Sequence, residues 1–121
     1  MRTQPEVLRD VHLSDRTIWL DQHGYLTDPE IWNQEVARYL AAQEQIELGD
    51  LHWEILNFMR DAYADKGIAV DQRFVLKYLS KKYGIDKAGA KDKLYELFPS
   101  GYVKHACKIA GMRQPRAWST G

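Results

Sequence analysis

The sequence is poor in cysteine: Cys107 is the only one among 121 residues. A single cysteine excludes an intramolecular disulfide, so a reducing cytoplasm is the expected location. No run of about 18 apolar residues occurs, and we therefore expect no membrane-spanning helix. The first residues contain no apolar segment of the kind that secretory signals have.

Motifs for metals, phosphates and cofactors are also missing from the sequence. The histidines are far apart along the chain, at His12, His23, His52 and His105. No cysteine pair or closely spaced histidine pair offers a metal site, and no glycine-rich loop follows a predicted strand. Carboxylates are abundant, but no pair of them stands out as a general acid and base. We therefore expect no metal and no cofactor.

The charges balance to zero but are unevenly distributed along the chain. Residues 21–65 hold ten acidic residues and two arginines, whereas residues 66–121 hold twelve basic and four acidic residues. No acidic residue follows Glu96. Such a division can steer a charged partner, or the two halves can simply attract each other within one fold.

The apolar pattern predicts a mainly α-helical protein with a small β-hairpin near its start. Residues 1–16 show no clear period and are expected to form a loosely held arm. Residues 17–27 are expected to form the hairpin, with a turn at Gln22-His23-Gly24. The rest predicts five helices in an orthogonal bundle, with starts at aspartates and ends at glycines. The expected ranges are 28–45, 50–66, 71–84, 86–98 and 102–110.

The fifth helix carries the cysteine on its apolar face. Val103, Ala106, Cys107 and Ala110 recur at helical spacing, and Gly111 stands where a helix-ending residue belongs. One interpretation is that Cys107 fills space in the core, because cysteine is among the most buried residue types.

The other interpretation is a reactive thiol. Lys104, Lys108 and Arg113 are close to Cys107 in sequence, and their charges would lower the pKa of its thiol. His105 lies on the opposite side of the helix and is a poor candidate for a general base.

Residues 72–97 have the outline of a helix-turn-helix, with Gly84 in the turn. Lys87, Lys91 and Lys93 on its second helix could contact phosphates, although the helix lacks arginine, asparagine and glutamine for reading base edges. DNA binding by a regulator is therefore an alternative function.

Four sequence segments resemble one known family. They are GYL (24–26), HWEILNFMRDAY (52–63), LFPSG (97–101) and KHACKIAG (104–111). They are similar to the DsrC/TusE family, which comprises the gamma-type partner of dissimilatory sulfite reductase and its sulfur-relay relatives. The resemblance runs from about Ile18 to Pro115. It implies a compact helical bundle with a small hairpin, in agreement with the pattern above.

The resemblance also implies a sulfur carrier with a flexible C-terminal arm. In the family a penultimate cysteine on this arm receives persulfide sulfur and passes it on. Gly111 and Pro115 match the family's glycine and proline. Thr120, however, occupies the penultimate position here, and Trp118 falls about where the outer thiol would be. Cys107 matches the inner cysteine of two-cysteine members.

The apolar pattern and the resemblance together divide the chain into an N-terminal arm (1–16), a helical domain (17–111) and a C-terminal arm (112–121). Two hypotheses follow from it: a diverged relative that binds the same partners without relaying sulfur, or a sulfurtransferase-like carrier that uses Cys107 alone. Protein partners of sulfur metabolism are expected, without a membrane. The residues expected to contact a partner are Lys104, Lys108, Arg113, Arg116 and Trp118.

Overall fold

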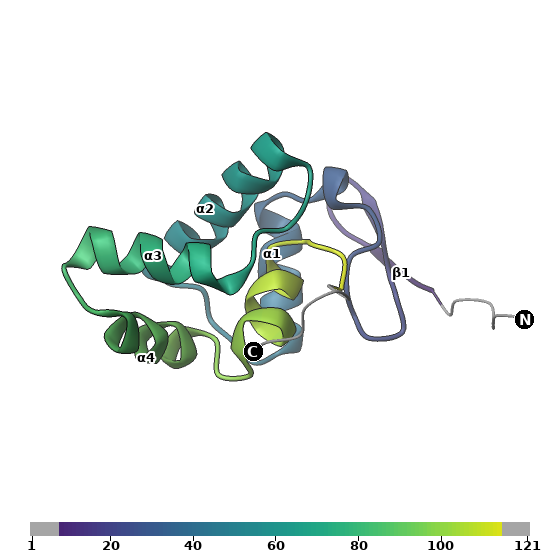
Figure 1. Ribbon diagram of the computed structural model, residues 1–121. Coiled ribbons are helices and arrows are strands. Elements are labelled where there is room, and N and C mark those ends of the chain that lie inside the picture. Colours follow the sequence, from purple (N-terminus) through teal and green to yellow (C-terminus); the bar gives the residue numbers. More distant parts are fainter. Residues whose placement is uncertain (1–7, 115–121) are drawn as a thin grey trace, which may run out of the picture.

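The computed structural model describes residues 8–114, as a helical body with a two-stranded hairpin at one side (Figure 1). Strand β1 (Arg9–His12) pairs antiparallel with β2 (Thr17–Leu20). The helical part comprises the short 3-10 helix η1 (Pro29–Ile31), α1 (Gln34–Gln43), α2 (Asp50–Lys66), α3 (Gln72–Tyr83), α4 (Lys87–Leu97) and the π-helix η2 (Tyr102–Cys107). The predicted class, a bundle of five main helices with a hairpin, is confirmed.

The hairpin strands differ from those predicted. We expected both strands within residues 17–27, but the partner of β2 is β1, inside the range that we had assigned to a loose N-terminal arm. Strand β1 is mostly exposed and polar, so its sequence carries no apolar alternation. The expected turn after Asp21 does exist, and it leads to a single bridge between Leu20 and Leu26. The carboxylate of Asp21 accepts the N–H groups of His23 and Tyr25 in this turn.

The helix predicted over 28–45 is interrupted. Asp28 caps η1 as expected, but Trp32 then adopts an extended backbone and Asn33 caps α1 by accepting the N–H of Val36. The break turns the indole of Trp32 away from the course of α1. Its N–H reaches the carbonyl oxygen of Ile109 at 2.9 Å.

The other helix ends agree with the predictions to within a residue. The carboxylates of Asp71 and Asp86 accept N–H groups in the first turns of α3 and α4, and Gly67 and Gly84 end α2 and α3 in the left-handed conformation. At α2 the cap is Gly49, whose N–H donates to the Nδ1 atom of His52, rather than the expected Asp50. The Nε2 atom of His52 donates to the carbonyl oxygen of Leu97, which ties α2 to the end of α4.

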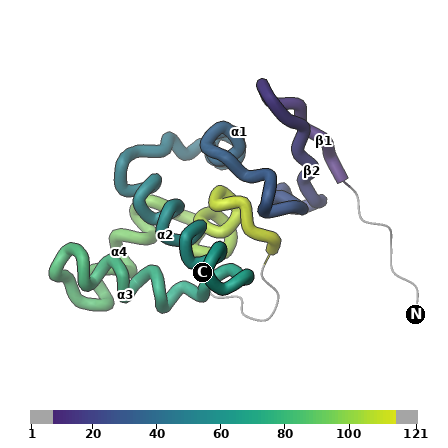
Figure 2. The backbone as a smooth tube through the Cα atoms, turned by 90° about the horizontal axis from the view of Figure 1, so that it is seen from above, coloured from purple at the N-terminus to yellow at the C-terminus, as the bar shows by residue number. Residues whose placement is uncertain are grey.

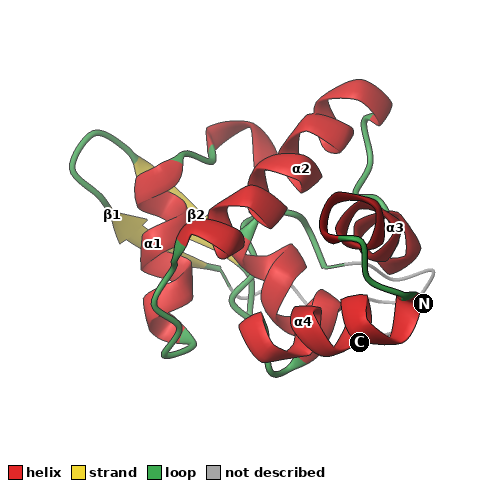
Figure 3. Ribbon diagram, turned by 90° about the vertical axis from the view of Figure 1, so that its left-hand side faces the viewer, coloured by secondary structure: helices red, strands yellow, loops and turns green. Residues whose placement is uncertain are grey.

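Helix η2 lies in the middle of the body, between α1 and the α3–α4 pair (Figures 1 and 3). We predicted an amphipathic α-helix, whereas the structure shows π-helical winding that is buried on nearly all sides. Its buried residues are Tyr102, Val103, His105, Ala106 and Cys107. Lys104 is the only exposed residue in η2. A helix that is buried on nearly all sides lies at the centre of a core.

A Schellman motif ends the helical segment that begins with η2. The N–H of Met112 donates to the carbonyl oxygen of Cys107, and that of Gly111 donates to the carbonyl oxygen of Lys108. Gly111 has a φ of 79°, which confirms it as the residue that follows the helix. Met112 is buried, so the body extends beyond residue 111, where we had placed its end. Residues 115–121 lie outside the described part of the chain.

Replacing Gly111 with alanine tests how tightly this end is packed. A Cβ atom there would lie 2.3 Å from Cδ1 of Trp32, besides straining the positive φ. Gly84 also has a positive φ but open space around it, so Gly84→Ala isolates the backbone cost of about 1 kcal/mol. We expect Gly111→Ala to lower the free energy of unfolding, measured in urea, by at least about 2 kcal/mol more than Gly84→Ala. Equal losses would show that Trp32 does not confine Gly111.

Candidate functional site

The thiol of Cys107 is sealed inside the body. The residue has 0% of its surface exposed and belongs to the main core cluster. Burial raises the pKa of the thiol to about 12, and a hydrogen bond with Tyr102 opposes the shift only in part. A thiol with this pKa is almost wholly protonated at neutral pH and is a poor nucleophile.

Tyr102 forms part of the seal around the sulfur. Its ring is fully buried, and its hydroxyl donates to the carbonyl oxygen of Val70 in the segment before α3. Burial raises the pKa of the Tyr102 phenol, with the neighbouring Cys107 as the next cause. The phenol therefore stays protonated. The same hydroxyl thus links the neighbourhood of the sulfur to the α2–α3 connection.

The cations expected around Cys107 do not converge on it. Lys104 points to solvent, while the ammonium group of Lys108 lies 3.1 Å from a carboxylate oxygen of Glu44. Arg113 donates from Nε to the carbonyl oxygen of Thr27 at 3.2 Å. The expectation that these charges lower the pKa of the thiol is wrong, because desolvation dominates and raises it.

His105 is engaged away from the thiol, as the sequence indicated. Its Nδ1 atom accepts the N–H of Ser100 at 3.0 Å, so the ring proton is on Nε2, which lies 3.3 Å from a Glu44 oxygen. Burial lowers the pKa of His105, although Glu44 acts in the opposite direction. Lys108 completes this cluster, and its ammonium group also lies 4.9 Å from the centre of the Tyr25 ring.

The end of the segment beginning with η2 has a second set of partners, which we call the arm clamp: Trp32, Arg60 and Gly111. The indole N–H of Trp32 donates to the carbonyl oxygen of Ile109, and the Arg60 guanidinium donates to that of Ala110 at 3.1 Å. Arg60 also donates to the carbonyl oxygen of Pro29 and stacks over the Trp32 ring at 4.7 Å. The clamp fixes the backbone just before Met112, which is still buried in the core.

The sequence did not point to the arm clamp. Trp32 lies inside the range predicted as one helix, 28–45, and Arg60 is one partly buried arginine of α2. The only available signal was Gly111, since a helix-ending glycine next to a buried helix needs partners for its last carbonyl groups.

The lysines of the DNA-binding alternative lie on α4. Lys87 and Lys91 are exposed and Lys93 is partly buried, and the same helix carries the acidic residues Asp92 and Glu96. Nothing in the described structure or in the comparisons below supports DNA binding.

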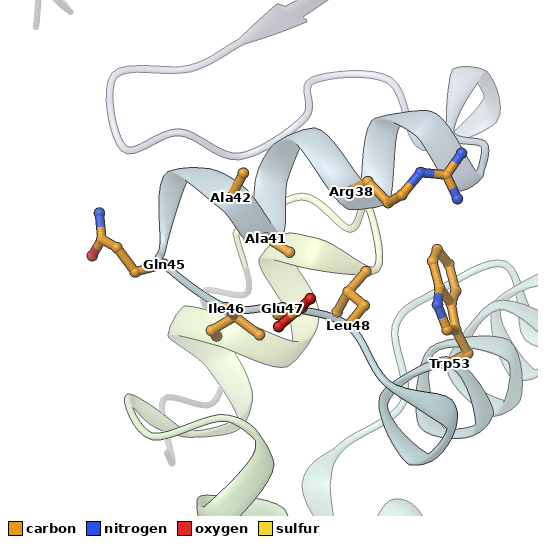
Figure 4. A pocket seen from close by; sticks show the side chains of 8 residues that line it. All are labelled: Arg38, Ala41, Ala42, Gln45, Ile46, Glu47, Leu48 and Trp53. Atoms are coloured by element: carbon orange, nitrogen blue, oxygen red, sulfur yellow. The ribbon is translucent and has the colours of Figure 1, made fainter.

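One hollow of about 520 Å³ lies on the surface between the end of α1 and the start of α2 (Figure 4). Ala41, Ile46, Leu48 and Trp53 give it apolar walls, and Arg38 lies near the Trp53 ring, with its guanidinium 5.9 Å from the ring centre. None of the expected site residues lines this hollow.

Between residues 8 and 114, no group of His, Cys, Asp or Glu side chains could hold a metal ion. In the same range, none of the helices combines the length and the apolar character that a membrane span requires.

The fold and the site together define a class: a small helical domain closed around a central helix that continues directly into a C-terminal segment. Residues 12–117 match the sequence profile described as "DsrC like protein". The chain therefore belongs to the DsrC-like family, as the sequence motifs had indicated.

Individual relatives agree with this assignment. The sulfurtransferase TusE of Pectobacterium atrosepticum is 41% identical over 100 residues, which are 83% of this chain and 91% of that protein. The TusE homolog of Haemophilus influenzae is 40% identical over 95 residues, covering 78% and 86% of the two chains.

Solved structures show the same fold. The oxidized gamma-subunit of the dissimilatory sulfite reductase (DsrC) from Archaeoglobus fulgidus superposes with a TM-score of 0.80 at 31% identity, covering 92% of this chain and all of that one. The NMR structure of Allochromatium vinosum DsrC gives 0.80 at 34% identity, with coverage of 93% and 100%.

The buried thiol leads to a prediction about its chemistry. At pH 8 we expect alkylation of native Cys107 by iodoacetamide to be about a thousandfold slower than in the urea-unfolded protein, because the folded pKa is about 12 instead of 9.0. Since the folded pKa lies above the unfolded one, this group's contribution to stability decreases as pH rises above about 9. Intact mass against time measures the rates. Similar native and unfolded rates would show that the thiol is accessible.

Proposed function

We propose that this chain is a DsrC/TusE-type binding protein of sulfur metabolism that contacts the family's protein partners without carrying sulfur on its terminal arm. Family membership supports the link to sulfur metabolism. The observation that carries the non-relaying part is Cys107: it is the only thiol in the chain, and it is fully buried with a raised pKa. A reducing cytoplasm fits the single unpaired thiol.

The sequence of the C-terminal arm supports the same proposal. Neither Ser119 nor Thr120 in the C-terminal arm can hold a persulfide. In the two-cysteine pattern that the resemblance implies, Trp118 falls about where the outer thiol would lie. A bulky aromatic in that place gives an apolar group for a partner's pocket instead of a sulfur atom.

The proposed contact is made by the C-terminal arm, which leaves the body at the arm clamp. When fully stretched, residues 115–121 can span up to roughly 24 Å. Arg113 and Arg116 would pair with acidic groups of the partner, while Trp118 anchors the end. Arg116 and Trp118 lie outside the described residues, and their roles rest on the sequence. Lys104, exposed on η2, adds a cation on the body.

The second candidate is a carrier that uses Cys107 alone. For this activity the core around Tyr102 would have to open so that the sulfur could reach a donor. The hydrogen bond between Tyr102 and Val70 and the complete burial of Cys107 oppose such an opening.

A persulfide assay separates the two candidates. After incubation of the folded protein with a persulfide donor, we expect the intact mass to show no added sulfur, because the thiol is protonated and enclosed. The urea-unfolded protein is the positive control, and Cys107→Ala is the negative one. A gain of one sulfur atom by the folded protein, absent from Cys107→Ala, would contradict the non-relaying proposal and favour the carrier.

Truncation tests the arm. Removal of residues 115–121 keeps Gly111, Met112 and the arm clamp, so the melting temperature should change by less than about 2 °C. Binding to sulfite-reductase or sulfurtransferase proteins from the same organism, measured by calorimetry, should fall at least tenfold.

A matched variant, Trp118→Ala, should reproduce most of that loss of affinity. Unchanged affinity after truncation would remove the arm from the interface. A large loss of melting temperature would instead show that the arm is part of the core.

A further inference from the structure

Helix α3 has an unpartnered outer face, which we call the α3 stripe: Arg73, Phe74, Lys77 and Lys81. All four residues are exposed. At 100° per residue they lie on the side of the helix opposite its buried residues, Gln72, Val75, Leu76 and Leu79. Figures 1 and 2 place α3 at the margin of the molecule, away from the hairpin.

The α3 stripe combines an apolar centre with positive charge. Phe74 exposes 48% of its surface, and Ile68, in the segment leading to α3, exposes 67%. Exposed aromatic and aliphatic side chains of this size are typical of interfaces when they are surrounded by polar groups. Helix α3 contains no acidic residue that could neutralise its own cations.

The cations of helix α3 differ in their partners. Arg73 is paired with Asp71 at 3.0 Å, and Lys82, on the side facing α2, is paired with Glu54. Within residues 8–114, neither Lys77 nor Lys81 has an ion-pair partner. Two ammonium groups beside an exposed phenyl ring thus remain available for an outside carboxylate.

We propose that the α3 stripe docks an acidic protein surface that carries an apolar side chain. Carboxylates of the partner pair with Lys77 and Lys81, and the apolar side chain packs on Phe74. Complementary charge raises the rate of encounter, and a desolvated aromatic provides most of the affinity. The inference takes from the proposed function only the idea that the partner is a protein. The α3 stripe itself is distinct from the C-terminal arm.

The residues of the stripe favour a protein over a nucleic acid. Its only arginine is already held by a carboxylate, and Asp71 itself would repel phosphates at that end of the helix. The stripe offers no asparagine or glutamine for base edges. The side chain of Ile68 can neither stack on a base nor donate a hydrogen bond. It can, however, pack against an apolar side chain of a protein.

Defined polymers serve as probes. The protein is titrated with a glutamate–tyrosine copolymer, with polyglutamate and with duplex DNA, and binding is followed by amide NMR shifts and calorimetry. We expect the largest shifts along the α3 stripe and about tenfold tighter binding of the copolymer than of polyglutamate. DNA should bind more weakly than either polymer.

Matched variants separate the two components of the surface. Phe74→Ala should remove the preference for the copolymer, whereas Trp19→Ala should keep it, because Trp19 is similarly exposed at 45% but lies on the hairpin. The double variant Lys77→Glu with Lys81→Glu should lower the affinity for both acidic polymers at least tenfold. The same reversal at Lys87 and Lys91 on α4 should change affinity less than about threefold. Circular dichroism checks that each variant is folded.

Several results would overturn the inference. Equal effects of the α3 and α4 charge reversals would indicate a general attraction to polyanions, and tighter binding of DNA on the stripe would indicate a nucleic acid. A dimer seen by sedimentation without any probe, and lost on reversal of Lys77 and Lys81, would identify a second copy as the occupant. Loss of polymer binding on removal of residues 115–121 would assign it to the arm, which leaves the proposed function intact.

Discussion

The rest of the structure depends on how the last carbonyl groups of the central helical segment find donors. Buried helix ends leave four such groups without partners inside the helix. Two of them are satisfied by the Schellman turn at Gly111, and the carbonyls of Ile109 and Ala110 by Trp32 and Arg60. Trp32 follows η1 and Arg60 belongs to α2, so the two donors come from distant segments. The need to satisfy these carbonyl groups therefore holds η1, α2 and the end of the central helical segment together.

Local signals in the sequence predicted most of the fold. Aspartate caps and left-handed glycines act within a few residues, so Asp71, Asp86 and Gly84 marked their helix ends correctly. The break at Trp32 was missed; it is accompanied by a hydrogen bond from Trp32 to Ile109, far along the chain, which no local pattern predicts. Strand β1 was missed because its pairing with β2, not its own pattern, makes it a strand.

The candidate site was predictable in its spacing but not in its chemistry. Helical periodicity put Cys107 on an apolar face, which the structure bears out. The lysines next to it in sequence suggested an activated thiol, yet Lys108 is paired with Glu44. That pair, like Glu44 with His105, joins the acidic and basic parts of the chain. Part of the uneven charge distribution therefore stabilises the fold, while Lys77 and Lys81 have no ion-pair partner within residues 8–114.

The π-helical winding of η2 has a geometric consequence. Such winding bonds each residue to the fifth one along, which is the separation of Tyr102 and Cys107. Ordinary α-helical winding of the same number of residues would instead rotate everything downstream by about 100°. The peptide oxygens of Ile109 and Ala110 would then face away from Trp32 and Arg60. The type of helical winding in this stretch thus sets the direction in which the C-terminal end of the body faces.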